Sequence, residues 1–424
     1  MRRFVLGLQW VVFHAGVIVS APVVLGAVLR LTPEETAALM QLSFFITGLG
    51  SLLQYLLGHR LSLLEGVAPP WWGTFIALAV VGQATGKPIE VVRTDIEGGM
   101  ILAGILMVIL GLTGIIQRIG KYITPRITGI MLFLFGIQVG GVGIRNLVTN
   151  GWVELFLGSL SLLFILFLLF RKEAFLSQSA ILLGVFFGWI AYLGLGITEG
   201  PQWSTDSLLS LPPLFLWGTP TFDPGTIFSL CSLGVLLVLN VVGSVKAMEG
   251  ALGREVDMKA YDRGLAITGI TCGVAGVTGG IGTIPMAISA GLVSVTGDDT
   301  PKAFLVASIL YMVFGLVVPL GTLLSSIPLS LAGAVLLVSV SSLVAFGIRG
   351  MTAEPMGKRE TLIVGLGVLA GVGILYLPAG IWKGVPVWTR GFVSNGVIMG
   401  TVLTILLEHG ILPGKGNRGQ KAFQ

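Results

Sequence analysis

Long apolar runs follow one another along this chain, and short polar or glycine-rich connections separate them. Each run is close to the roughly 20 residues that an α-helix needs to cross the hydrocarbon core of a bilayer. The pattern predicts about fourteen membrane-spanning helices. They are expected at residues 5–29, 35–57, 61–83, 95–117, 125–147, 151–170, 178–197, 226–247, 262–282, 283–297, 301–325, 328–348, 361–381 and 390–409.

The first run follows Met1-Arg2-Arg3, as a signal peptide would, but it continues to about Leu29 without a clear small-residue cleavage site. We interpret it as the first spanning helix. Basic residues gather in alternate connections, which the positive-inside rule places in the cytoplasm. The sequence therefore predicts a multi-pass protein of the cell (cytoplasmic) membrane with both termini in the cytoplasm. The expected cytoplasmic set is Arg60, Arg118, Lys121, Arg126, Arg171, Lys172, Lys246, Arg254, Lys259, Arg263, Lys302, Arg349, Lys358, Arg359, Lys415, Arg418 and Lys421.

Composition agrees with the lipid bilayer as the main solvent. Hydrophobic residues make up 54% of the chain and charged residues 11%, whereas a soluble domain carries roughly 25% charged residues. The formal net charge is +5, but no basic stripe with interleaved aromatics is present, so no nucleic-acid partner is expected. Cys231 and Cys272 lie in apolar runs and imply neither a disulfide nor a metal site. No cofactor is expected.

The longest polar or mixed stretch, about Thr198 to Pro224, divides the predicted spans into two groups of seven. An odd number in each half makes the second half enter the membrane upside down. This is the layout of an inverted repeat, which transporters use to present one site alternately to either side.

Two spans, the third and the tenth, contain helix-breaking segments. Pro69 and Pro70 interrupt the third span, so its helix is expected to begin at one of them. In the tenth, a glycine-rich approach leads to Thr283 as an expected cap and to Pro285 in the first turn. Two facing half-helices would offer unpaired backbone N–H groups and positive dipole ends near the middle of the membrane, a polar pocket for a small ligand. The alternative is a pair of helix kinks with no ligand.

The end of the tenth span resembles the nucleobase–ascorbate transporter family, the xanthine/uracil permeases. That family's signature is Gln/Glu/Pro-Asn-x-Gly, four residues, then Thr and Arg/Lys/Gly. The same frame here holds Gly291, Thr296 and Gly297 at the matching positions, while Ile288 and Ser289 depart from it. Further similar stretches are Leu8-Gln9 through Pro22, Thr124 to Gly129, and Gly347-Ile348-Arg349. The chain is identified as a divergent member.

The resemblance implies an all-α, uracil-permease-like fold with half-helices in spans 3 and 10. It implies a core domain from residues 1–120 (spans 1–4) and 201–325 (spans 8–11). It also implies a gate domain from 121–200 (spans 5–7) and 326–410 (spans 12–14), before a cytoplasmic tail at 411–424. Family members are commonly homodimers, and many couple nucleobase uptake to H⁺.

The departures from the family pattern fall on residues that contact the base or carry the proton. The family's acidic residue in the eighth span corresponds to Asn240, its second carboxylate or amide to Ile288, and the histidine often found in its first span to Trp10. The usual site carboxylates are therefore missing, which leaves the identity of the base and the coupling ion open.

Two ionisable residues inside spans are candidates for proton coupling. Glu65 precedes Pro70 at membrane depth, where a carboxyl is costly unless it is paired or functional. It would bind and release a proton or accept a hydrogen bond from a base N–H. The alternative is a position near the interface and an ion pair with Arg60 or another cation. His14 lies in the first span as a second proton acceptor, or as a structural hydrogen-bonding group.

The remaining candidates are substrate contacts. The amide of Asn240 offers donors and acceptors for the edge of a base, or alternatively joins helices. Trp71 and Trp72 are candidates for stacking, and adjacent helical residues point about 100° apart, so one of them is expected to face the site. The neutral residues expected near the second half-helix are Thr283, Met286, Ile288 and Ser289.

The sequence thus predicts a secondary active transporter for a nucleobase such as xanthine, uric acid or uracil, with proton symport by alternating access. The alternative within the same fold is an anion transporter of the sulfate or bicarbonate type, which would use the helix dipoles. A membrane enzyme is disfavoured because the chain has no HExxH motif, no His/Cys metal cluster and no nucleotide-binding loop. A non-transporting sensor or scaffold is the last alternative.

Overall fold

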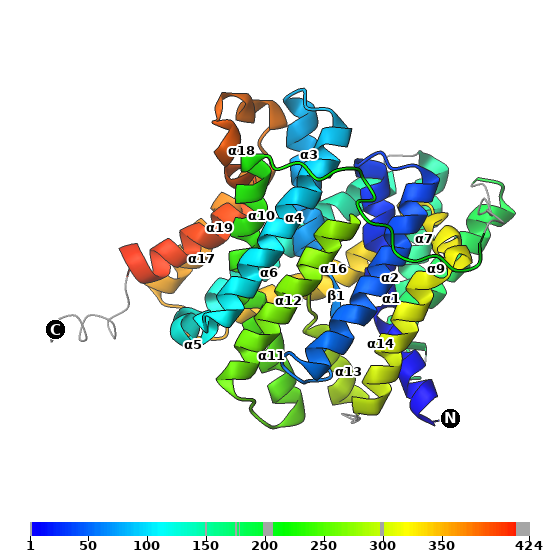
Figure 1. Ribbon diagram of the computed structural model, residues 1–424, viewed down its shortest axis with the longest axis horizontal. Helices are drawn as coiled ribbons and strands as arrows, with labels where there is room; N and C mark the ends of the chain where they lie inside the picture. Colours follow the sequence, from blue (N-terminus) through cyan, green and yellow to red (C-terminus); the bar gives the residue numbers. More distant parts are fainter. Residues whose placement is uncertain are drawn as a thin grey trace.

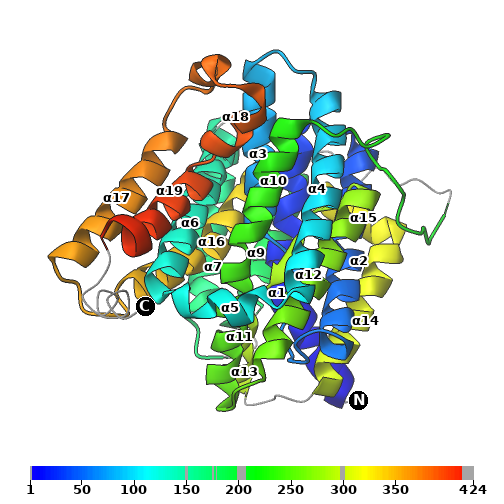
Figure 2. The ribbon, with the colours of Figure 1, turned by 60° about the vertical axis from the view of Figure 1, so that its left-hand side comes forward.

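The structure is a computed structural model that describes residues 2–148, 151–173, 176–177, 179–197, 207–296 and 301–412. The expected signature position Gly297 and residues 413–424 of the expected tail lie outside this description. The helices pack side by side in one bundle (Figures 1 and 2). The elements of the first half are α1 (Arg2–Val28), α2 (Pro33–Leu56), β1 (Glu65–Val67), α3 (Pro69–Ala84), α4 (Ile89–Leu112), α5 (Ile115–Ile119), η1 (Gly120–Tyr122), α6 (Pro125–Val148), α7 (Trp152–Leu169) and α9 (Ala180–Gly194).

The second half ends in short helices. Its elements are α10 (Pro224–Leu236), α11 (Val238–Leu252), α12 (Met258–Thr278), β2 (Thr283–Pro285), α13 (Ile288–Thr296), α14 (Pro301–Leu316), α15 (Val318–Ser325), α16 (Leu329–Met351), α17 (Lys358–Leu375), η2 (Ala379–Gly384), α18 (Val387–Val393), α19 (Gly396–Ile405) and η3 (Leu406–Ile411). The predicted eighth span is thus built from α10 and α11, and the predicted eleventh from α14 and α15.

Capping residues mark the starts and ends of several helices. Thr32 and Glu35 form a reciprocal capping box at the start of α2. Asp223 caps α10 by accepting a hydrogen bond from the N–H of Thr226. At the end of α12, Gly279 adopts a left-handed conformation, which a residue without a Cβ does at little cost.

Within the described part of the chain, six helical runs are long and apolar enough to cross a membrane. They are α2, α4, α6, α7, α16 and the run Pro224–Leu252 formed by α10 and α11. On α7, large apolar side chains such as Phe156, Leu163 and Phe167 are exposed, as expected for a surface that faces lipid. The all-α, multi-pass architecture predicted from the apolar runs is confirmed.

The two halves interlock through pairs of long helices. The most extensive contacts join α6 to α16, α4 to α12 and α2 to α14, and each pair takes one helix from each half. Close approach depends on glycine: a Cβ on Gly104 of α4 would lie 2.5 Å from the backbone nitrogen of Gly273 on α12. Small residues at such crossings let backbones approach closely in membranes. The limits of the predicted core and gate domains stay predictions.

The two broken spans meet at the centre of the bundle. The strands β1 and β2 pair antiparallel, with Glu65 opposite Pro285 and Val67 opposite Thr283. Helix α3 then begins at Pro69, as predicted. The predicted start of the second half-helix, with Thr283 as cap and Pro285 in the first turn, is wrong: these residues are β2, and α13 begins at Ile288. The strand pairing satisfies backbone groups that a helix start at Thr283 would have left exposed.

Candidate functional site

The crossing of β1 and β2 holds the starts of the two half-helices together. The N–H of Ala68 donates to the carbonyl of Gly282 at 3.2 Å, and the N–H of Met286 donates to the carbonyl of Leu64 at 2.8 Å. The indole N–H of Trp71 adds a bond to the carbonyl of Thr283 at 3.3 Å. These contacts fix α3 and α13 relative to each other without relying on a ligand.

A cavity of about 330 Å³ opens beside this crossing, within the size range of small-molecule sites. One wall comes from α1, α3, α11 and the β2–α13 segment, and the other comes from α6 and α16. The cavity extends toward the start of α6 and the end of α16, where Pro125 and Gly350 line it. Polar lining residues that the structure describes are Ser20, Thr124, Thr128, Asn240, Ser244, Lys246, Ser339 and Ser342.

Of the predicted substrate contacts, the structure brings Trp72, Asn240, Met286 and Ile288 together on the cavity wall. The other predicted residues are buried behind that wall and do not line it. They are His14, Glu65, Trp71, Thr283 and Ser289.

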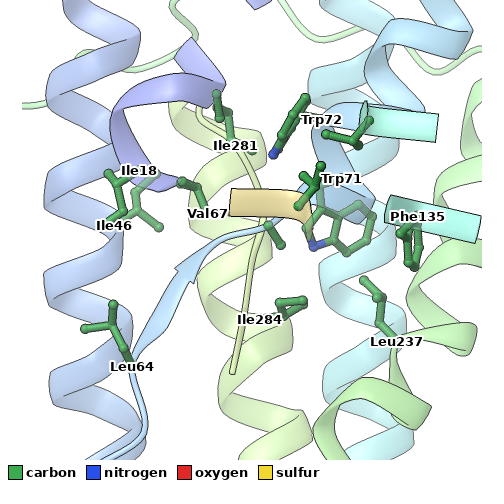
Figure 3. Close-up of a cluster of buried hydrophobic side chains, with 14 of the residues drawn as sticks. Ile18, Ile46, Leu64, Val67, Trp71, Trp72, Phe135, Leu237, Ile281 and Ile284 are labelled. Carbon is green, nitrogen blue, oxygen red and sulfur yellow. The ribbon is translucent and has the colours of Figure 1, made fainter. Parts of the chain in front are cut away.

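The two adjacent tryptophans have different environments, as the angular spacing on a helix requires. Trp72 lines the cavity with Pro69 and Phe135. Trp71 instead fills the space between the half-helices, where a Cβ on Gly282 would come within 2.7 Å of its indole nitrogen. Figure 3 shows the two indoles leaving the start of α3 in different directions. Of these two indoles, Trp72 is the one in the cavity wall, where its side chain is fully buried.

Asn240 and Ser244 lie one turn apart on α11, and both line the cavity. The Ser244 hydroxyl donates to the carbonyl of Pro285 at 2.7 Å, which ties α11 to β2. Asn240 is 8% exposed, and its amide oxygen lies 3.5 Å from the Ser244 hydroxyl. Sequence reasoning missed Ser244, although its spacing of four residues from Asn240 places it on the same helix face.

Glu65 lies in a closed polar cluster on the far side of the strand pair. Its carboxylate accepts hydrogen bonds from the Gln54 amide at 2.9 Å and from the Thr283 hydroxyl at 3.2 Å, while its backbone N–H donates to the Ser51 hydroxyl at 2.9 Å. The side chain is fully buried. Among the described residues no ion pair forms between Glu65 and Arg60, the alternative considered from the sequence.

His14 connects the first helix to the second half-helix. Its Nδ1 lies 3.0 Å from the carbonyl of Trp10, so this nitrogen must carry the proton. Its Nε2 lies 3.0 Å from the hydroxyl of Ser289, which also accepts a hydrogen bond from the N–H of Leu64 at 3.2 Å. The ring therefore fits the neutral tautomer that accepts from Ser289. This arrangement braces α13 from behind the cavity.

The two half-helix starts differ in the backbone groups that they present. At α3, Pro69 and Pro70 have no N–H, and the N–H of Trp71 donates to the carbonyl of Ala68 at 3.0 Å. At α13, the N–H groups of Ala287 and Ile288 have no hydrogen-bond partner among the described residues, and both residues line the cavity. The expectation that both starts offer unpaired donors is correct only for α13.

Comparison with known proteins places this geometry in a family. The model of the Permease family, Xan_ur_permease, matches residues 1–380. YwdJ of Bacillus subtilis (strain 168), by its name a candidate purine permease, is 29% identical over 96% of this chain and 95% of its own length. The xanthine permease XanQ of Escherichia coli (strain K12) is 25% identical, over 93% of this chain and 88% of its own length.

A solved structure supports the same fold. The transmembrane domain of a cyanobacterium bicarbonate transporter, BicA, superposes with a TM-score of 0.58 at 14% identity, covering 92% of this chain and 97% of that domain. The similarity shows a shared architecture, and the family model and the relatives confirm the resemblance stated from the sequence. The chain belongs to the permease family, and it is a multi-pass membrane transporter rather than an enzyme.

Proposed function

We propose that this protein is a secondary active transporter for a nucleobase, a purine or pyrimidine such as xanthine, uric acid or uracil. The observation that carries the proposal is the cavity of about 330 Å³ that joins a flat ring, Trp72, to an amide, Asn240. Stacking on the ring and hydrogen bonding to the amide are the two contacts that a flat heterocycle makes. The names of the relatives YwdJ and XanQ agree with this substrate class.

The position of the cavity supports transport by alternating access. One wall belongs to the elements around the half-helices, and the other belongs to α6 and α16. A shift of one wall along the other would carry the site toward the opposite face. We place the protein in the cell membrane with both termini in the cytoplasm. The start of α6 and the end of α16 then lie on the cytoplasmic side. The cavity extends toward these two ends, so it faces inward. The family resemblance favours a homodimer.

Coupling to H⁺ through Glu65 is the second part of the proposal. The carboxyl group is buried beside neutral donors, Gln54 and Thr283, with no cation in ion-pair contact among the described residues. An isolated buried carboxylate is costly, and binding a proton removes that cost. Thr283 belongs to β2, which is continuous with the cavity wall at Ile284 and Pro285. Protonation of Glu65 would therefore act on the site through this strand.

Uptake into proteoliposomes tests both parts. The panel is uracil, xanthine, uric acid, hypoxanthine, guanine, adenine and sulfate, each with and without an imposed pH gradient. Wild type is expected to accumulate a base only with the gradient. Glu65→Gln, which keeps the shape of the side chain, is expected to exchange the base without gradient-driven accumulation.

The matched control is Glu97→Gln, which neutralises another buried carboxyl, on α4 and away from the cavity. This variant is expected to keep gradient-driven uptake. Intact accumulation in Glu65→Gln would remove Glu65 from the coupling mechanism. Transport of sulfate in place of every base would favour the anion transporter considered from the sequence, whose support here is the fold shared with BicA.

A further inference from the structure

A glutamine near the end of α2 and a histidine just after that helix each hold one polar atom without a partner. His59 is 2% exposed, and Gln54 is fully buried. Nε2 of His59 and Oε1 of Gln54 make no hydrogen bond to a described residue. Because buried polar atoms are nearly always hydrogen-bonded, each of these two atoms needs a partner.

The two atoms are complementary and lie beside the same glycine of α12. The N–H of Leu61 donates to Nδ1 of His59 at 3.1 Å, so the proton of the neutral ring is on Nε2, which is a donor. Oε1 of Gln54 is an acceptor. A Cβ on Gly264 would lie 3.3 Å from Cδ2 of His59, the atom bonded to Nε2, and 3.7 Å from Oε1 of Gln54. The donor and the acceptor therefore border one point, at which glycine places no side chain.

The other end of the Gln54 amide faces the buried carboxyl group of Glu65. Nε2 of Gln54 lies 2.9 Å from Oε2 of Glu65. The same nitrogen lies 2.9 Å from the carbonyl oxygen of Gly264 and 3.0 Å from the hydroxyl of Thr268. An amide N–H that points at a carboxylate favours its ionised form, whereas an amide oxygen in that place would accept a hydrogen bond from the protonated form. The orientation of this amide therefore decides which form of Glu65 is favoured.

The charged groups near this contact leave His59 neutral. Neither His59 nor Glu65 forms an ion pair in the described part of the chain. Arg263 donates to the carbonyl of Gly58 at 3.4 Å, next to His59, and this positive charge disfavours a second one on the imidazole. The other ionisable side chains near the contact have partners of their own or are exposed. They are Arg60, which is exposed, Asp262, which accepts from Ile116 and Gln117, Cys272, which donates to Thr283, and His14, which contacts Ser289.

From these contacts we propose that His59 is a positioning residue for proton release from Glu65. Its Nε2–H bonds Oε1 of Gln54 beside Gly264 and holds the amide with its N–H groups toward the carboxylate. If the amide turned round, its N–H groups would face the His59 donor, which is unfavourable. His59 thereby favours ionised Glu65 in the inward-facing arrangement, where a symporter releases its proton. The proposal rests on the proposed coupling of H⁺ through Glu65 and names the groups that set it.

The pH dependence of base exchange in proteoliposomes, with equal pH on both sides of the membrane, tests the proposal. His59→Phe keeps a ring and removes both nitrogen atoms. His59→Gln keeps an N–H donor at about the reach of Nε2. His59→Asn keeps only an acceptor close to the backbone, which can still bind the N–H of Leu61 as in an Asx turn. His409→Phe is the matched control, because His409 lies on η3 and its Nε2 contacts the carbonyl of Tyr122.

Wild-type exchange is expected to fall as the pH rises and Glu65 loses its proton, and Glu65→Gln is expected to show no such fall. His59→Phe and His59→Asn lose the donor that holds the amide, so their midpoints are expected to move to higher pH by about one unit, a tenfold change in proton concentration. His59→Gln and His409→Phe are expected to keep the wild-type midpoint. In a Gln54→Leu background, His59→Phe is expected to shift nothing further, because the contact is already lost.

The midpoint does not depend on the amount of folded protein, so a variant that reconstitutes poorly still reports it. If His59→Asn keeps the wild-type midpoint and His59→Gln does not, the histidine only holds the turn at Leu61, and the proposal is overturned. If every His59 variant keeps the wild-type midpoint, the proposal is also overturned, while coupling through Glu65 stands. If Glu65→Gln has the pH dependence of wild type, coupling through Glu65 itself fails, and the role of His59 fails with it.

Discussion

At the scale of single residues, the site is built from neutral groups where carboxylates were expected from the family pattern. Asn240 lines the cavity, and its amide oxygen lies 3.5 Å from the Ser244 hydroxyl. Ser244 in turn holds Pro285 at the crossing of the half-helices. The side chain that meets the ligand is therefore positioned by the elements that shape the cavity.

Replacing Asn240 by alanine is expected to weaken binding of the base without unfolding the protein. The variant removes one hydrogen bond to the ligand, and the expected rise in KM for the best base is about five- to tenfold. Asn146→Ala is the control, since Asn146 is a buried asparagine of α6 that does not line the cavity. Initial uptake rates in proteoliposomes, measured over a range of base concentrations, give the KM of each variant. Equal effects of the two substitutions would show that Asn240 acts only in packing.

At the scale of elements, an ion-pair network joins the start of α6 to two segments near the C-terminal end of the chain. Arg126 is 4% exposed and pairs with Glu354 at 2.9 Å and with Glu408 at 2.8 Å. Thr124, which lines the cavity, donates to Glu408 as well. The network links α6 to the α16–α17 connection and to η3, so it holds one wall of the cavity in place.

Arg126→Met is expected to destabilise the protein by about 3–5 kcal/mol, because Glu408 would stay buried without its cation. Arg171→Met is the contrasting variant: Arg171 pairs with Glu173 at the surface, where an ion pair contributes about 1 kcal/mol or less. Thermal unfolding in detergent, monitored as the loss of monodisperse protein, compares the stability of the two variants. Unfolding of both variants at the wild-type temperature would contradict the structural role of the network.

At the scale of the whole molecule, the cavity lies at a boundary between two sets of helices. A Cβ on Gly243 of α11 would lie 3.4 Å from the methyl group of Thr128 on α6. This contact crosses the cavity, and it would have to break if one wall moves along the other.

A disulfide across this boundary is expected to stop transport. Gly243→Cys and Thr128→Cys are combined in a background with Cys231→Ala and Cys272→Ala, because a side chain at position 243 would contact Thr128. Oxidation is expected to abolish uptake, and reduction is expected to restore it; each single cysteine variant is the control. Undiminished uptake by the fully oxidised protein would mean that α6 and α11 do not separate during transport.

The sequence by itself determined the architecture of this protein. Apolar runs of membrane-spanning length predict helices. Inside the bilayer no water can bond the backbone N–H and C=O groups, and a helix pairs them within the segment. Pro69 and Pro70 predicted the start of α3 because two successive prolines remove two backbone donors and do not fit inside a continuous helix. The family resemblance also pointed to α11, because Asn240 occupies the position of an acidic residue.

Only the tertiary structure decided which candidates share the cavity. Glu65 and Ile288 lie on opposite sides of the crossing because β1 and β2 pair, and that pairing joins segments more than two hundred residues apart. Local patterns could not assign Thr283 to a strand or separate Trp72 from Trp71. Long-range packing sets the surroundings of a side chain, and those surroundings decide what the side chain can bind.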